Sequence, residues 1–209
     1  GIPILRPRKS PSGLVQLGAD LPIKILLAGY FGCGNIGDDA MLMGFAENLS
    51  RAEYDVAALS GVPEETYQLY GLHAYPRRDM KLVKRAIAEC DVLVFPGGSI
   101  FQDVTSVKSV AYYAQLVKMA KAEGKRVAML AQGVGPLKTF LGKRMAAQAY
   151  NSADLITLRD PGSATTLKSI GVKKKTFVTA DMAFLLKPPP ETDLQNFAVG
   201  EMATVGIAP

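Results

Sequence analysis

The fold is decided by the segment IKILLAGYFGCGNIGDDAML, which runs from Ile23 to Leu42. It begins with an apolar run of strand length and continues through the glycine-rich sequence G-C-G-N-I-G, from Gly32 to Gly37. A helical pattern follows directly. A strand, a glycine turn and a helix in this order predict the first βα unit of a parallel sheet.

The same alternation continues along the chain. Strands are predicted at 24–28, 56–59, 72–75, 92–95, 126–130, 155–158 and 176–178, and helices at 39–49, 64–70, 80–90, 106–122, 140–151 and 163–170. The strand segments are nearly continuous in Val, Ile and Leu, which is typical of strands buried on both faces. The sequence therefore predicts an α/β fold, a Rossmann-like parallel sheet with helices on both faces.

Proline-rich segments mark the expected domain boundaries. Residues 1–22 contain four prolines among basic and small residues, and we expect a flexible leader there. The folded domain is expected at 23–186. Three consecutive prolines at 188–190 predict a linker over 187–203. The apolar segment 204–209 looks like the first strand of a second domain, so we interpret the chain as part of a two-domain protein.

Composition narrows the function classes. Of the 209 residues, 48% are hydrophobic and 21% are charged, which is typical of a globular domain. The net charge of +5 mildly favours an anionic substrate, and aromatic residues do not alternate with the basic ones, so no nucleic acid partner is expected. Two cysteines and one histidine exclude a Cys/His metal site and leave only an aspartate-based magnesium site open. We expect no metal and no cofactor.

Localisation follows from what the sequence lacks. No apolar run reaches the roughly 18 residues that cross a bilayer. The first residues carry basic side chains without the apolar core of a signal peptide. We therefore expect a cytoplasmic protein.

Four loops follow predicted strands and are rich in glycine or polar residues. They lie at 29–39, 96–103, 131–137 and 159–163. Ligands of open parallel sheets bind outside the carboxyl ends of the strands, and glycines let backbone N–H groups approach them closely. We therefore predict a ligand site at this edge, with ordinary turns as the alternative. The candidate residues in the second and third loops are Gly97, Gly98, Ser99, Gln132 and Gly133.

Arg159 is the leading candidate for direct contact with a substrate. It ends a predicted strand at the ligand edge, and a guanidinium binds a carboxylate or phosphate through two hydrogen bonds. The alternative is a structural ion pair with Asp160 or Asp154. Asp160 could instead cap the next helix at Ser163. Asp181 follows the last strand, and it could either contribute to the ligand site or cap a turn or helix.

The first glycine loop does not fit a nicotinamide cofactor. Tyr30 and Phe31 separate the strand from the G-x-G sequence, and the carboxylates of Asp38 and Asp39 at the helix start would repel a phosphate. The second strand also lacks the acidic residue that holds the ribose. We expect Asp38 to cap the helix instead, and Asp39 or Asn35 to hydrogen-bond the hydroxyls of a sugar.

Taken together, the motifs resemble those of the polysaccharide pyruvyltransferases. The resemblance covers about residues 23–186. It rests on GYFGCGNIGDDAML at 29–42, DVLVFPGGSIFQD at 91–103, GKRVAMLAQGVGPL at 124–137, DLITLRD at 154–160 and TAD at 179–181. These five segments follow one another in the family's order and spacing.

The resemblance implies the N-terminal half of a glycosyltransferase-B-like enzyme whose active site lies between two Rossmann-like domains. Such an enzyme transfers the pyruvyl group of phosphoenolpyruvate onto two hydroxyls of a sugar in a cell-wall or extracellular polysaccharide precursor, as a cyclic ketal. A lipid-linked acceptor would imply peripheral association with the inner face of the plasma membrane.

The resemblance also implies roles for individual residues. Arg159 would bind phosphoenolpyruvate, and the loops at 97–99 and 132–133 would line the donor pocket. Phe31 and Cys33 would face the acceptor sugar, although the family carries an aromatic residue at position 33. The family's catalytic histidine lies in the second domain, so we expect the 209 residues alone to be inactive.

Two other functions remain open at this point. One is a nucleotide-sugar-dependent glycosyltransferase of the same fold. The other is a non-catalytic α/β binding domain, in which Arg159 would be structural.

Overall fold

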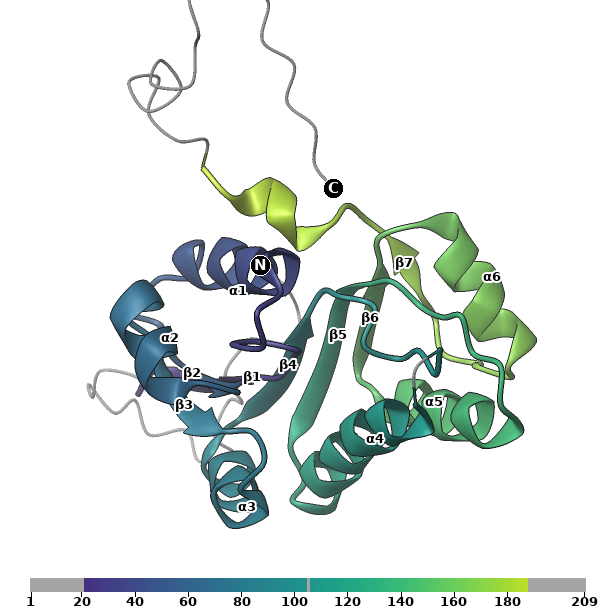
Figure 1. Cartoon of the computed structure of the whole chain (residues 1–209), viewed down its shortest axis with the longest axis horizontal. Coiled ribbons are helices and arrows are strands. Elements are labelled where there is room, and N and C mark those ends of the chain that lie inside the picture. Colours follow the sequence, from purple (N-terminus) through teal and green to yellow (C-terminus); the bar gives the residue numbers. More distant parts are fainter. Residues whose placement is uncertain (1–20, 105, 188–209) are drawn as a thin grey trace, which may run out of the picture.

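The computed structural model describes residues 21–104 and 106–187. Its centre is a seven-stranded sheet in the order β3-β2-β1-β4-β5-β6-β7 (Figure 1), and all neighbouring strands are parallel. The strands are β1 (Ile23–Leu27), β2 (Tyr54–Ser60), β3 (His73–Pro76), β4 (Val92–Pro96), β5 (Arg126–Gln132), β6 (Leu155–Leu158) and β7 (Phe177–Val178). The predicted α/β class and all seven predicted strands are confirmed.

Each strand except β7 is followed by an α-helix, as predicted. The helices are α1 (Ile36–Glu47), α2 (Pro63–Tyr70), α3 (Met80–Glu89), α4 (Val107–Ala122), α5 (Phe140–Ser152) and α6 (Pro161–Ser169). A short 3-10 helix, η2 (Met182–Leu185), follows β7 and was not predicted. The largest difference is at α1, which begins at Ile36 rather than at residue 39, because Asn35 caps it.

Two apolar cores form because helices cover both faces of the sheet. In β1, Leu26 belongs to the core under α3, α4 and α5, whereas Ile25 and Leu27 belong to the core under α1. This alternation follows the two-residue period of a strand. Figure 1 shows α3, α4 and α5 on one side of the sheet and α1 with η2 on the other.

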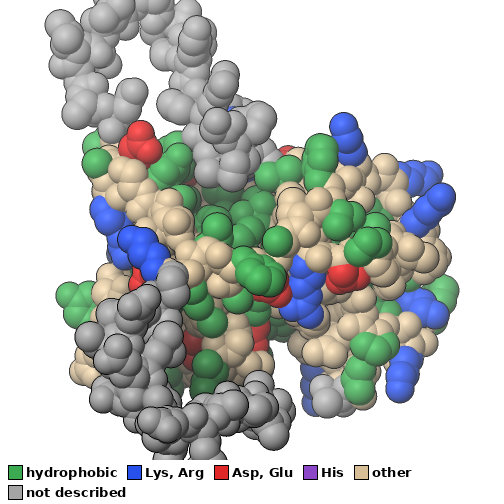
Figure 2. Space-filling view, turned by 90° about the horizontal axis from the view of Figure 1, so that it is seen from above, with side chains coloured by type: hydrophobic (Ala, Val, Ile, Leu, Met, Phe, Trp, Pro, Cys, Tyr) green, Lys and Arg blue, Asp and Glu red, His purple; other side chains and the backbone are tan. Residues whose placement is uncertain are grey.

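Figure 2 looks onto the side that carries α1 and η2. Apolar side chains occupy the middle of this view, and basic side chains gather along its right-hand side. Phe184 of η2 is 83% exposed and Ile36 at the start of α1 is 86% exposed. Basic side chains also lie on the left of this view, and apolar side chains lie among the basic ones on its right.

The strand order creates a crevice between β1 and β4. From β1 the chain continues outward to β2 and β3, and it then returns to place β4 on the other side of β1. The loops that leave β1 and β4 therefore turn in opposite directions, and parallel sheets bind ligands at such a point. The predicted glycine loops at 29–39 and 96–103 both start there.

The described elements run from β1 to η2, within the predicted domain at 23–186. The predicted leader at 1–22, linker at 187–203 and second-domain strand at 204–209 lie outside the described residues, apart from positions 21, 22 and 187. Among the described helices, none combines the length and the hydropathy needed to span a bilayer.

Candidate functional site

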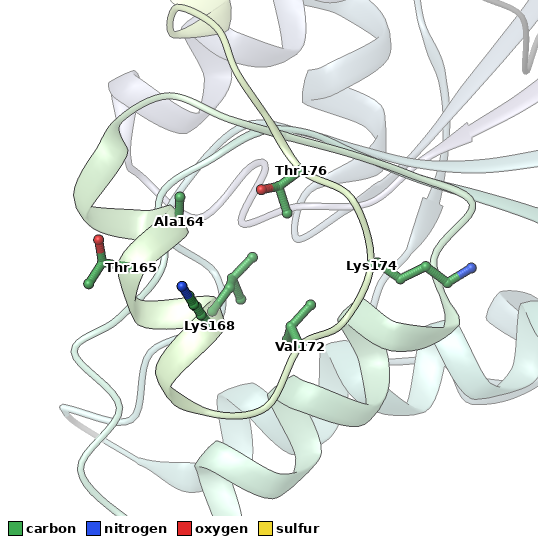
Figure 3. Close-up of a pocket in the computed structure, with 7 residues that line it drawn as sticks. Ala164, Thr165, Lys168, Val172, Lys174 and Thr176 are labelled. Carbon is green, nitrogen blue, oxygen red and sulfur yellow. The ribbon is translucent and has the colours of Figure 1, made fainter.

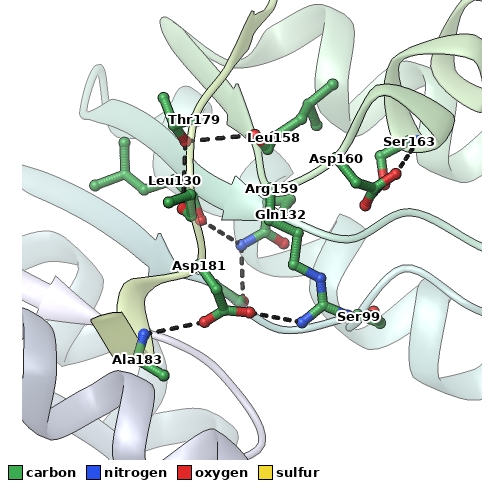
Figure 4. Close-up of polar contacts among 12 residues, drawn as sticks. Ser99, Leu130, Gln132, Leu158, Arg159, Asp160, Ser163, Thr179, Asp181 and Ala183 are labelled. Atoms are coloured by element: carbon green, nitrogen blue, oxygen red, sulfur yellow. Dashed lines mark hydrogen bonds and ion pairs between the residues drawn. The ribbon is translucent and has the colours of Figure 1, made fainter. Parts of the chain in front are cut away.

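Arg159 lies at the carboxyl end of β6, where the four predicted loops meet. Its Nη1 atom forms a 2.8 Å ion pair with Oδ2 of Asp181, and its Nη2 atom donates to Oγ of Ser99 at 2.9 Å (Figure 4). These contacts use two of the five N–H donors of the guanidinium, and 35% of the side chain is exposed. The alternative of a structural ion pair had the wrong partners: Arg159 pairs with Asp181, and Asp154 pairs with Lys121.

The backbone approaches Arg159 most closely at Gly133. A Cβ atom at this position would lie 2.5 Å from Oγ of Ser99 and 2.8 Å from Nε of Arg159. The Gly133 amide also donates to the carbonyl of Gly98 at 3.0 Å, which ties the loop after β5 to the loop after β4. Only glycine leaves the guanidinium in its present position.

The side chain of Gln132 holds the loop after β4 from inside the protein. A β-bulge between Met129 and Gln132, with Ala131 at a φ of 46°, turns this side chain into the interior. Its Nε2 atom donates to the carbonyls of Phe95 and Gly97 at 3.0 and 2.8 Å. Gln132 is completely buried, so its predicted place in the lining of the donor pocket is wrong, and it instead holds the loop after β4.

Gly97 and Gly98 face helix α1 across the crevice. Both have positive φ angles, 101° and 83°, which favour glycine. A Cβ atom at Gly98 would lie 3.0 Å from Oδ1 of Asp38, and one at Gly97 would lie 2.5 Å from Sδ of Met41. The first turn of α1 thus packs directly on the loop after β4.

Asp38 is a buried carboxyl group between two arginines. Burial, with a smaller contribution from the Asp39 carboxylate, raises its pKa to about 6, although Arg77, Arg159 and a hydrogen bond with Asn35 act to lower it. The prediction that Asp38 caps α1 is wrong. Asn35 is the cap, and its side chain accepts from the Gly37 amide at 3.1 Å. The carboxyl group of Asp38 instead interacts with the Asn35 side chain and is influenced by both arginines.

A second cation at this edge is Arg77, which directly follows β3. It donates from Nη1 to the Cys33 thiol at 3.1 Å and from Nη2 to the Tyr113 hydroxyl at 3.0 Å. The Tyr30 ring lies 5.1 Å from its guanidinium carbon. The sequence analysis missed Arg77, although it follows a predicted strand just as Arg159 does.

The aromatic residue that the first loop exposes is Tyr30, not Phe31. Phe31 is 2% exposed and belongs to the core under α1, whereas Tyr30 is 46% exposed. The ring of Phe31 fills the space beside Gly29, where an added Cβ atom would overlap it. The expectation that Phe31 faces an acceptor sugar is therefore wrong.

Asp160 and Asp181 each cap a helix. Asp160 accepts from the Ser163 amide at 2.6 Å and from the Ser163 hydroxyl at 2.7 Å, and these hydrogen bonds hold its pKa below the usual range. The cap alternative for Asp160 is confirmed. Asp181 accepts from the Ala183 amide at 3.0 Å, which confirms its cap role, and it also pairs with Arg159.

A separate depression of about 420 Å³ lies between α6 and the segment that leads to β7 (Figure 3). Val172 and Thr176 point toward it, whereas the side chain of Lys174 points away. None of the predicted site residues lines it. In the described ranges, no three His, Cys, Asp or Glu side chains are grouped as a metal ion would require.

Comparisons with known proteins agree with this architecture. A family model described as polysaccharide pyruvyl transferase matches residues 35–204. A search of curated protein sequences finds no match.

Two solved structures are similar to this chain at low sequence identity. A putative UDP-N-acetylglucosamine 2-epimerase from Listeria monocytogenes has a TM-score of 0.52 and 12% identity, over 84% of this chain and 50% of that one. An alpha-glucosyltransferase in complex with UDP and a 13-mer DNA has a TM-score of 0.48 and 12% identity, over 75% and 42%. The chain thus spans half or less of the length of these proteins.

Proposed function

Because this chain belongs to the polysaccharide pyruvyl transferase family, we propose that it forms the donor-binding half of an enzyme that uses phosphoenolpyruvate. The enzyme would transfer the pyruvyl group onto two hydroxyls of a sugar in a polysaccharide precursor, as a cyclic ketal. The observation that carries the proposal is Arg159, an arginine with unused donors at the ligand edge of the sheet.

Arg159 suits a ligand that carries a carboxylate and a phosphate. Asp181 and Ser99 fix the guanidinium through one N–H each, so its orientation is set before a ligand arrives. The remaining N–H groups can form charge-assisted hydrogen bonds to either anionic group of phosphoenolpyruvate. The glycines at 98 and 133 allow Asp38, Ser99 and Arg159 to pack closely against the backbone of the two loops.

The chemistry also requires proton transfers, and we assign one of them to Asp38. A proton adds to C3 of phosphoenolpyruvate, C2 becomes electrophilic, and a sugar hydroxyl attacks C2 while it loses its own proton. Phosphate leaves, and the second hydroxyl closes the ketal and loses its proton. A carboxyl group with a pKa of about 6 is mostly ionised at neutral pH and suits a base that accepts a hydroxyl proton.

The acceptor that we propose is a lipid-linked polysaccharide precursor at the inner face of the plasma membrane. The net charge of +5 supports this placement, since the cytoplasmic surface of the membrane is negatively charged.

The proposal is tested by calorimetric titration of the chain with phosphoenolpyruvate. We expect Arg159→Gln to weaken binding by about 10- to 100-fold, the worth of one charged hydrogen-bonded contact. Arg85→Gln is the matched control, because Arg85 is exposed on α3 and pairs only with Glu89 among the described residues. Unchanged binding by Arg159→Gln would contradict the proposal. Binding of UDP-N-acetylglucosamine in place of phosphoenolpyruvate would favour the glycosyltransferase alternative.

A further inference from the structure

A pocket of about 790 Å³ opens beside Asp38, on the opposite side from Arg159 in the strand order. It lies at the carboxyl ends of β1, β2 and β3 and at the first turns of α4. The residues that give it chemical character are Tyr30, Cys33, Arg77, Arg78, Lys108 and Tyr112. Its volume is within the range of sites that bind whole small molecules.

The pocket is positively charged throughout. Three of its lining residues are cations, and no lining residue is acidic. Arg78 and Lys108 are exposed at its rim, whereas Arg77 is half-buried. In the part of the chain that the structure describes, Arg77 forms no ion pair, and its hydrogen-bond partners are the neutral groups of Cys33 and Tyr113.

The Asp38 carboxylate interacts with Arg77, which lowers the pKa of Asp38, but Asp38 does not line the pocket, so an anion bound in the pocket would add a counter-charge there. Withdrawing a guanidinium from water is costly unless a counter-charge compensates for it. The Arg77 backbone is also fixed, because its amide donates to the Ser60 carbonyl at 2.9 Å and its carbonyl accepts from the Tyr112 hydroxyl at 2.9 Å. The cation is thus held rigidly in a pocket with no negative charge of its own.

The walls of the pocket indicate the rest of the ligand. The rings of Tyr30 and Tyr112 lie 5.1 and 5.2 Å from the guanidinium carbon of Arg77, and both line the pocket. Aromatic faces beside hydroxyl groups suit a pyranose ring, which has both apolar and polar surfaces. We propose that this pocket binds a sugar phosphate, with the phosphate on Arg77, Arg78 and Lys108 and the ring against the tyrosines.

This inference rests on the proposed function, because it identifies the acceptor as a sugar that already carries a phosphate ester. With the phosphate at Arg77, the hydroxyls of the sugar could extend toward Asp38, whose carboxyl group is influenced by both arginines. The donor would approach from the side of Arg159. The two anionic substrates would thus be held by different arginines.

The test is calorimetric titration of the chain with N-acetylglucosamine 1-phosphate. We expect this probe to bind at least about tenfold more tightly than neutral N-acetylglucosamine, because only the former carries the anion. UDP-N-acetylglucosamine and inorganic phosphate are titrated in parallel. Tighter binding of the nucleotide sugar than of the sugar phosphate identifies a diphosphate-linked acceptor when phosphoenolpyruvate also binds, and it overturns the acceptor assignment when phosphoenolpyruvate does not bind. Tighter binding of inorganic phosphate than of the sugar phosphate overturns the role of the tyrosine walls.

The double variant Arg78→Gln, Lys108→Gln removes two charges at the rim and leaves the buried contacts of Arg77 in place. We expect it to weaken binding of the sugar phosphate by about tenfold and to leave binding of phosphoenolpyruvate unchanged. Lys118→Gln is the matched control, because Lys118 is exposed on the same helix about 15 Å farther along its axis. Equal affinity of the wild type, the double variant and the control for the sugar phosphate overturns the inference.

Arg159→Gln separates this inference from the proposed function. We expect Arg159→Gln to retain binding of the sugar phosphate and to lose binding of phosphoenolpyruvate. If the double variant weakens the sugar phosphate while Arg159→Gln leaves phosphoenolpyruvate unaffected, the pocket stands and the donor site fails. If Arg159→Gln is the variant that loses the sugar phosphate, the pocket assignment fails.

Discussion

Replacement of Asp38 by Asn should stabilise the protein at neutral pH. Burial raises the pKa of Asp38 from 3.8 to about 6, so the folded state resists its ionisation. Above pH 6 the carboxylate is charged in both states, and it destabilises the folded one. A shift of about two units corresponds to about 3 kcal/mol, and this is the stability that Asp38→Asn should gain at pH 7.5.

The stability that Asp38→Asn gains should increase as the pH rises. Between pH 3.8 and 6 the folded state binds more protons at this position than the unfolded state, so the cost of Asp38 grows as the pH rises. The gain from Asp38→Asn should therefore be about 1.5 kcal/mol at pH 5 and about 0.5 kcal/mol at pH 4. Below pH 3.8 Asp38 is neutral in both states, and the gain should disappear.

The assay is urea unfolding followed by circular dichroism at several pH values between 4 and 8. Asp160→Asn is the control of opposite sign, because hydrogen bonds from Ser163 lower the pKa of Asp160 and asparagine still caps the helix. It should lose stability at neutral pH and lose less as the pH falls. A gain from Asp38→Asn that does not change with pH, or a loss at pH 7.5, would refute the reasoning.

Two glycines give further predictions. Gly133→Ala should reduce the affinity for phosphoenolpyruvate by about tenfold or more, because the added Cβ atom would lie 2.8 Å from Nε of Arg159 and displace the guanidinium. Calorimetry measures this affinity. An unchanged circular dichroism spectrum shows that the fold is retained. Gly44→Ala should destabilise the protein by about 1–3 kcal/mol in urea unfolding, although alanine favours helices, because its Cβ atom would lie 2.6 Å from the Met182 carbonyl. A gain in stability would contradict this prediction.

The elements of the fold could be predicted because each one carries a local signal. Strand β4 and residues 127–131 of β5 are uninterrupted apolar segments, and parallel sheets bury such strands on both faces. Asp160 followed by Pro161 marks the start of α6 through standard cap preferences. The helix η2 carries only the Asp181 cap as a local signal, and its four residues also depend on packing against α1.

The site could be located but not described in detail. Arg159 and Gly133 each follow a predicted strand, and this was enough to identify them as candidate site residues, because the carboxyl ends of all strands in a parallel sheet lie at one edge. The inward turn of Gln132 depends on a bulge in β5, and the burial of Asp38 depends on the loop after β4, which is distant in the sequence. Such features arise from tertiary contacts, and no local pattern reports them.

The pairing of Arg159 with Asp181 has a consequence for synthesis on the ribosome. The proposed sugar-phosphate pocket takes its residues from Tyr30 to Tyr112, so all of its walls are synthesised before β5. Arg159, in contrast, cannot reach its final orientation until Asp181 has been added, 22 residues later. The proposed acceptor pocket can therefore form early in translation, while the donor arginine is among the last parts of this domain to be set in place.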